Sequence, residues 1–167
     1  MTISTEAGRL PVLVATFFGA GFSPVAPGTV GSLAALPLAF ALLHMDIVVA
    51  TLTVIGLYFL GLWSANHLEK VSGQHDAQII VIDEVVGVCV SALLLSWWFL
   101  GAADPYLLLL LSFLSFRVFD VLKPWPIDWI DRTVGGGVGV MIDDLVAALM
   151  GVLAVAGGYF ILLLSSI

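Results

Sequence analysis

Two pairs of adjacent acidic residues, Asp83-Glu84 and Asp143-Asp144, lie where long apolar segments begin. A carboxylate in a bilayer costs about 2.5–3.5 kcal/mol at the centre of a helix and less near its end. Two adjacent acids also repel each other. Bound metal or nearby cations would offset that cost, and carboxylate oxygens are hard ligands suited to Mg²⁺ or Mn²⁺. The four acids are therefore candidate metal ligands. The alternative is that they only complement helix dipoles at the N-terminal ends.

Three more charged residues end another apolar segment. Arg117, Asp120 and Lys123 follow at intervals of three, which places them on neighbouring turns of one helix face. This spacing is compatible with a phosphate clamp, in which Arg117 and Lys123 hold a phosphoryl group beside a carboxylate-bound metal. The alternative is an Arg117–Asp120 salt bridge that reaches the membrane interface.

A third candidate feature is the stretch Gly28-Thr29-Val30-Gly31-Ser32, which follows two prolines and opens an apolar segment. Free backbone N–H groups at a helix N-terminus, together with the Thr29 and Ser32 hydroxyls, would form an anion site. The signal is weak by itself. Thr29 also fits a simple N-cap, and Gly31 fits close helix packing.

The apolar composition of the chain indicates that membrane helices position these residues. Hydrophobic residues make up 61% of the 167, charged residues only 10%, and the net charge is −7. This excludes an ordinary water-soluble domain, a disordered chain and a nucleic-acid-binding protein. We predict one all-α domain over residues 1–167, a polytopic membrane helix bundle. Residues 10–22 are predicted as an interfacial or re-entrant helix, with a sixth span as the alternative. A span needs about 20 apolar residues, and about five are predicted, near 29–43, 47–66, 79–100, 106–122 and 140–164.

The cations predict how the bundle is oriented. With five spans, every lysine and arginine falls on one side of the membrane, which the positive-inside rule assigns to the cytoplasm. Successive spans run in opposite directions through the membrane. This alternation places both acidic pairs, the Arg117–Lys123 segment and the Gly28–Ser32 turn on that same side. We therefore expect one polar layer at the cytoplasmic face. The cations concerned are Arg9, Lys70, Arg117, Lys123 and Arg132.

The sequence gives little support for phosphate-loop or cysteine chemistry, and it leaves two non-enzymatic functions open. The chain lacks the phosphate-loop pattern, and its single cysteine, Cys89, lies in an apolar run typical of core packing. An ion- or proton-coupled transporter subunit stays open, because intramembrane acids serve such proteins. A bundle subunit without a site of its own is a further alternative.

Three stretches of the sequence resemble the phosphatidylglycerophosphatase A family. They are GFSPVAPGTVGSL at 21–33, HDAQIIVIDEVVG at 75–87, and FRVFDVLKPWPIDWIDRTVGGGVGVMIDDLVAALMG at 116–151. One departure is Ala77, where the family pattern leads us to expect proline. The resemblance implies a small Mg²⁺-dependent bacterial inner-membrane enzyme. Such an enzyme removes the terminal phosphate of phosphatidylglycerophosphate to give phosphatidylglycerol.

Residues and resemblance together give one hypothesis. Mg²⁺ is held by Asp83 or Glu84 with Asp143 or Asp144, and Arg117 and Lys123 neutralise phosphoryl charge. Asp120 is the general base or a covalent nucleophile, and Lys123 is grouped with it as catalytic. Gly28, Thr29 and Ser32 join the substrate-binding set.

The expected ligand is a phospholipid in the membrane, with no nucleic acid and no obligatory protein partner. The site is expected on the cytoplasmic side of the inner membrane. Another lipid phosphate remains an alternative substrate.

Overall fold

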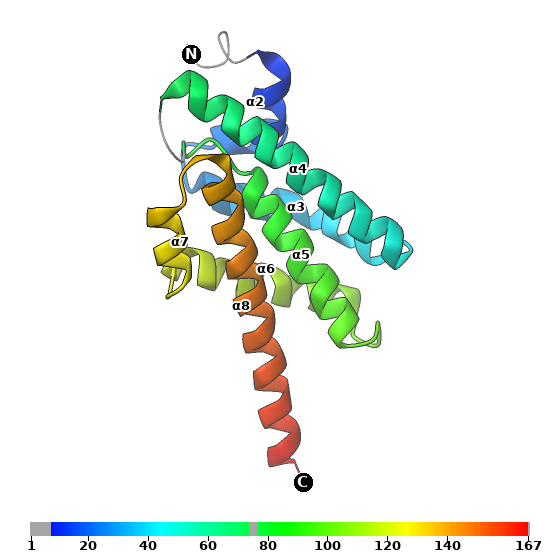
Figure 1. Cartoon of the computed structure of the whole chain (residues 1–167). Coiled ribbons are helices and arrows are strands. Elements are labelled where there is room, and N and C mark those ends of the chain that lie inside the picture. The colour runs from blue at the N-terminus through cyan, green and yellow to red at the C-terminus, as the bar shows by residue number, and fades with distance from the viewer. Residues whose placement is uncertain (1–7, 74–76, 167) are drawn as a thin grey trace.

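The computed structural model describes residues 8–73 and 77–166, and every regular element within them is a helix (Figure 1). The predicted all-α class is therefore confirmed for this part of the chain. His75 and Asp76, from the second motif, lie outside the described residues. The elements are α2 (Arg9–Ala15), the short 3₁₀ helix η1 (Ala20–Phe22), α3 (Pro27–Leu43), α4 (Ile47–Ser72), α5 (Ile82–Trp98), α6 (Pro105–Leu122), α7 (Ile127–Thr133) and α8 (Gly136–Ser165).

Three of these helices, α4, α6 and α8, are long and apolar enough to cross a membrane, judged over the described ranges. The other two predicted spans are helices α3 and α5, each of 17 residues. A span needs about 20 residues, so the predicted count of about five spans is not confirmed. The five predicted segments do each form a helix.

Apolar side chains cover much of the outer surface. Leu52 and Phe59 on α4, Leu110 on α6, and Leu153 and Phe160 on α8 are each more than half exposed. Exposed apolar faces of this extent are costly in water and favourable in hydrocarbon. Together with the three long helices, they define an integral membrane protein.

Over residues 8–22, where the structure describes the N-terminal region, no sixth span forms. Its two helical pieces, α2 and η1, have seven and three residues, well short of a bilayer crossing. Gly19 separates them in the left-handed conformation, with φ 98°. The structure thus agrees with the short N-terminal helix that was predicted, and its place at the interface stays a prediction.

Helix α5 is the centre of the bundle and contacts α3, α4, α6 and α8. Its sequence allows close approach, because small and β-branched residues such as Val85, Val88 and Ala92 are buried along it. At Gly87 a methyl group would lie 2.4 Å from the ring of the fully buried Phe116 of α6. This contact fixes how α5 and α6 lie against each other, and with them the charged residues at their ends.

Several helix boundaries differ from expectation. Helix α4 runs to Ser72 and not to residue 66. Residues 127–133, which lie between the predicted spans 106–122 and 140–164, form α7, and α8 begins at Gly136 rather than near Val140. As a result Asp143 and Asp144 lie two turns inside α8 and not in its first turn. The early start has a tertiary cause: the Gly137 N–H donates to the Asn66 Oδ1 of α4 at 2.9 Å. Such a donor at a helix start needs an acceptor, and here another helix supplies it.

Candidate active site

A polar cavity of about 540 Å³ lies at the end of the bundle where α5 and α8 begin and α6 ends. Every predicted site residue except Thr29 and Ser32 lines it. The predicted convergence of separate segments at one end of the bundle is therefore what the structure shows. The lining residues are Pro24, Ala26, Pro27, Gly28, Gln78, Ile80, Asp83, Glu84, Arg117, Asp120, Val121, Lys123, Val140, Asp143 and Asp144.

Three acids form a compact cluster on two helices. Asp83 and Glu84 of α5 and Asp144 of α8 each place a carboxylate oxygen within 4.8 Å of the others. Asp83 is 7% exposed and Asp144 is 4% exposed. Among the described residues, Glu84 Oε2 and Asp144 Oδ2 are buried without a hydrogen-bond partner.

Buried polar atoms are nearly always satisfied, and a charged one without a partner is strongly destabilising. A divalent cation held by this cluster would supply the positive charge that these buried carboxylates lack. An all-carboxylate donor set is hard and suits Mg²⁺ or Mn²⁺ rather than a soft-ligand metal. Asp83, Glu84 and Asp144 therefore fit a metal ion of this class.

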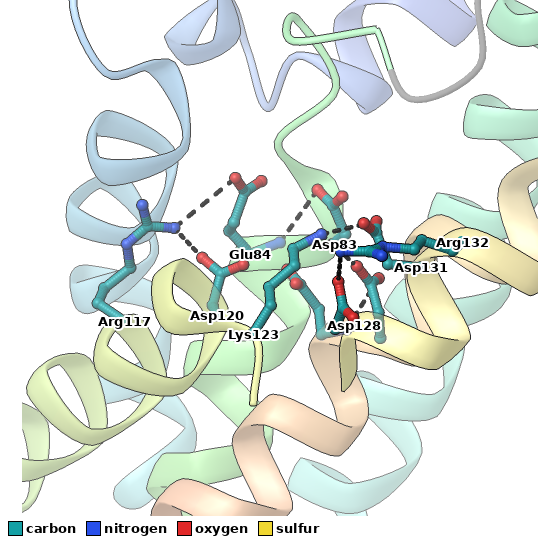
Figure 2. A network of polar contacts seen from close by, with 10 residues as sticks. Asp83, Glu84, Arg117, Asp120, Lys123, Asp128, Asp131 and Arg132 are labelled. Atoms are coloured by element: carbon teal, nitrogen blue, oxygen red, sulfur yellow. Dashed lines mark hydrogen bonds and ion pairs between the residues drawn. The ribbon is translucent and has the colours of Figure 1, made fainter. Parts of the chain in front are cut away.

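Arg117 contacts residues of three helices at the cavity, and Figure 2 shows two of these contacts, with Asp120 and Glu84. Its guanidinium pairs with Asp120 on its own helix α6, and its Nη1 lies 3.8 Å from Glu84 Oε1 on α5. Its Nη2 lies 3.3 Å from the Thr29 hydroxyl of α3. Thr29 thus belongs to the site through Arg117. The Arg117–Asp120 salt bridge, which was the alternative to a phosphate clamp, is present. It faces the cavity and not open solvent, since the Arg117 side chain is only 16% exposed.

Ser32 is not brought to the cavity. It is fully buried, and its hydroxyl donates to the Gly28 carbonyl at 2.8 Å within α3. A serine one turn into a helix commonly satisfies itself in this way. Its position gives no support to the predicted role in substrate binding.

Lys123 lies between two carboxylates from different helices (Figure 2). Its Nζ is 2.7 Å from Asp131 Oδ1 on α7 and 2.9 Å from Asp143 Oδ2 on α8. Asp143, expected among the metal ligands, therefore faces Lys123 while its neighbour Asp144 faces the acid cluster. Adjacent residues point about 100° apart on a helix, so Asp143 and Asp144 contact different groups.

The protonation state of Lys123 follows from these contacts. Burial by itself lowers the pKa of the ammonium, but the hydrogen bonds and charges of Asp131 and Asp143 outweigh it and raise the pKa above its ordinary range. Lys123 is therefore a permanent cation at neutral pH. It is suited to holding an anionic group and not to donating a proton.

Asp131 is the site residue that sequence reasoning missed. It lies between the predicted spans 106–122 and 140–164, eight residues beyond Lys123, and helical spacing gave no reason to pair the two. The chain turns at Pro124 and then forms α7, which brings Asp131 back to Lys123. The available signal was that Asp131, an acid, lies in the same short segment as Lys123, with which it could form an ion pair.

Asp131→Asn is expected to lower kcat/KM for phosphate release by about tenfold. The change removes one charge-assisted hydrogen bond to Lys123, worth about 1.5–3 kcal/mol, and leaves the ammonium held less firmly, by Asp143. Asp128→Asn is the matched control on α7: its partner Arg132 is 74% exposed, and surface pairs contribute little. Steady-state kinetics of both variants test this, and equal activities would contradict it.

Gly28→Ala is expected to cost activity more than stability. A methyl group there would lie 2.1 Å from Glu84 Oε1 and 3.2 Å from Arg117 Nη1. The far end of Glu84 can move aside, so the thermal midpoint changes little, but a displacement of about 1 Å at a reacting centre can cost about 10²-fold. Gly56→Ala is the control, since no described atom lies within 4 Å of its added methyl. Kinetics and thermal unfolding separate the effects; a stability loss with full activity would count against this prediction.

The fold and cavity define an integral membrane protein whose buried acid cluster, Asp83, Glu84 and Asp144, could hold a metal ion. The chain belongs to the phosphatidylglycerophosphatase A family, because the model of that family matches residues 13–159. The resemblance seen in the three sequence stretches is thereby confirmed.

Several curated proteins are similar over most of their length. A phosphatidylglycerophosphatase A of Escherichia coli is 38% identical over 152 residues, covering 89% of this chain and 81% of the relative. One of Haemophilus influenzae is 40% identical over 148 residues, covering 86% and 85%. A Bacteroides thetaiotaomicron protein, provisionally named a phosphatidylinositol-3-phosphatase, is 38% identical over 157 residues, covering 88% and 92%. No solved structure gives a significant match.

Proposed function

We propose that this chain is a Mg²⁺-dependent phosphatase that hydrolyses phosphatidylglycerophosphate to phosphatidylglycerol and phosphate. Membership of the phosphatidylglycerophosphatase A family supports the reaction and the substrate. It also favours an enzyme over the transporter subunit that intramembrane acids had left open.

The observation that carries the proposal is the composition of the cavity. A buried acid cluster with two orphaned oxygens lies next to the cations Arg117 and Lys123. A phosphomonoester dianion would be repelled by the acids alone. When bound, a divalent cation neutralises this charge, polarises the phosphoryl group and orients a water molecule. Asp83, Glu84 and Asp144 would hold that cation.

The other residues bind and orient the phosphate. Arg117 presents its guanidinium from α6 and is aligned by Asp120 and the Thr29 hydroxyl. Lys123 presents a fixed positive charge, held by Asp143 and Asp131. In this arrangement Asp143 positions Lys123 and does not bind the metal. Fixed cations facing the three phosphoryl oxygens stabilise the charge that develops during transfer.

Asp120 takes the proton of the attacking water in this proposal. It is 12% exposed, lines the cavity and is held by Arg117, so its carboxylate has a defined position. As the water oxygen bonds to phosphorus, the bond from phosphorus to the lipid oxygen breaks. The leaving alkoxide takes up a proton from water, Asp120 returns its proton to the solvent, and phosphatidylglycerol remains in the membrane.

The proposed location is the bacterial inner membrane, with the cavity on the cytoplasmic side. The relatives are bacterial, and the described cations lie near the start of α2 or the ends of α4 and α6, or on α7. The positive-inside rule favours the cytoplasm for such an end. The proposed ligand is a membrane phospholipid, with no obligatory protein partner.

The experiment is phosphate release by the detergent-purified protein, with Mg²⁺ and with EDTA. Phosphatidylglycerophosphate is compared with phosphatidylinositol 3-phosphate, because the Bacteroides thetaiotaomicron relative carries that second name. Mg²⁺-dependent release from the first lipid is expected. Preferential phosphate release from phosphatidylinositol 3-phosphate would show that the substrate is a phosphoinositide. No phosphate release from either lipid by folded protein would overturn the proposal.

A further inference from the structure

The polar cavity reaches the outer surface of the bundle at Val121. This residue of α6 lines the cavity, and it is 66% exposed. It follows Arg117 by four residues and Val118 by three. Residues three and four apart are neighbours on a helix surface. Val121 therefore lies at the border between the cavity, where Arg117 is, and the exposed face of α6.

That exposed face is apolar along the whole helix. Its side chains recur every three or four residues from the outer end to the cavity, and each is about half exposed or more. Arg117 and Asp120, the charged residues of this fully described helix, both line the cavity instead. Such a stripe faces hydrocarbon in a membrane. It consists of Leu107, Leu110, Leu114, Val118 and Val121.

The turn before α3 contributes a second apolar part of the cavity rim. Pro24 and Ala26 line the cavity, while Val25 between them is 74% exposed and Phe22 is 56% exposed. The mouth of a strongly charged cavity is thus flanked by side chains that favour lipid.

We infer that the acyl chains of the substrate leave the cavity past Val121 and the Pro24–Ala26 turn, and lie on the exposed face of α6. The occupant is a phospholipid with a terminal phosphomonoester. Its phosphate stays between Arg117 and Lys123, and its chains contact Val118 and Leu114. This inference rests on the proposed function. It explains how a dianionic headgroup reaches buried acids without withdrawing acyl chains from hydrocarbon, which would be strongly unfavourable.

Val121→Trp tests this exit, with Leu153→Trp on α8 as the control. Leu153 is 67% exposed, close to the 66% of Val121, but it lies on another helix and does not line the cavity. Each variant is assayed with long-chain phosphatidylglycerophosphate in mixed micelles and with a soluble short-chain form. We expect Val121→Trp to lower kcat/KM for the long-chain lipid by about tenfold, mainly through KM, with a clearly smaller loss for the short-chain form.

Leu153→Trp should affect neither substrate. An equal loss on both substrates in Val121→Trp, or no loss on either, would overturn the exit. Failure of the proposed function is distinct from this, because the unaltered protein would then release no phosphate from either lipid.

A second measurement does not depend on activity or on the folding of a variant. The unaltered protein is irradiated with phosphatidylglycerophosphate that carries a photoreactive diazirine in one acyl chain, and the adducts are mapped by mass spectrometry. Adducts around Val118 and Val121 that unlabelled lipid phosphate displaces, and that neutral lipid does not, are expected. Adducts instead at the apolar cavity near Phe99 and Tyr159, at the other end of the bundle, would overturn the inference.

Discussion

Asp144→Asn is expected to reduce Mg²⁺-dependent phosphate release by about 10²–10³-fold, the range seen when one preorganised electrostatic group is removed from a water-excluded site. Asp144 is 4% exposed, and its Oδ2 has no partner among the described residues. It also completes the acid cluster with Asp83 and Glu84. Asparagine keeps the shape of the side chain and removes the charge that attracts the cation.

The same variant separates metal binding from folding. Without metal it should be at least as stable as the unaltered protein, because it removes one of several carboxylates that repel each other. A ligand at 100 times its Kd stabilises a protein by about 2.7 kcal/mol, and this Mg²⁺-dependent gain should disappear in the variant. Thermal unfolding in detergent with Mg²⁺ and with EDTA measures both effects.

The control is Asp104→Asn at the other end of the bundle. Asp104 caps α6 by accepting the Tyr106 and Leu107 N–H groups, and asparagine serves equally well as a cap. This variant should keep both activity and the Mg²⁺-dependent shift. A fully active Asp144→Asn variant, or one that Mg²⁺ still stabilises, would remove Asp144 from the metal site.

Asp120→Asn is expected to lower kcat by about 10²–10⁴-fold, the usual contribution of a positioned general base. Unlike Asp144→Asn, it should keep most of the Mg²⁺-dependent rise in thermal midpoint, since Asp120 lies outside the acid cluster of Asp83, Glu84 and Asp144. Substrate KM should change less than kcat, because Arg117 retains its contact with the Thr29 hydroxyl.

Acid quenching of the unaltered protein during turnover of ³²P-labelled lipid distinguishes the two roles of Asp120. A general base leaves no label on the protein, whereas a nucleophile leaves a phosphorylated aspartate that Asp120→Asn abolishes. Activity within twofold of the unaltered protein in Asp120→Asn would rule out both roles.

The sequence alone determined the helical class, the main helices and most of the site. Apolar runs of sufficient length can only be satisfied as helices in hydrocarbon, so the five long segments were evident from composition. Charged residues are rare in such segments, so Asp83, Glu84, Arg117 and Asp120 were conspicuous. The parity of successive helices then predicted that these residues meet at one end, as the structure shows.

Only the tertiary structure decided how the charges are paired. Asp143 contacts Lys123, whereas Asp144 lies in the acid cluster. The rotation of α8 about its axis determines which of the two acids faces which group. That rotation depends on packing and on the tertiary hydrogen bond that the Gly137 N–H at the start of α8 donates to Asn66 Oδ1. Neither appears in the local pattern of residues, because both join segments far apart in the chain.

The same reason explains the remaining differences. Asp131 reaches Lys123 because α7 folds back toward the end of α6. Thr29 contacts the site through the guanidinium of Arg117. Ser32 does not line the site, because its hydroxyl bonds to the backbone of its own helix. Local spacing determines which residues share a helix face. Contacts between helices determine which neighbour each side chain meets, and these contacts exist only once the bundle has packed.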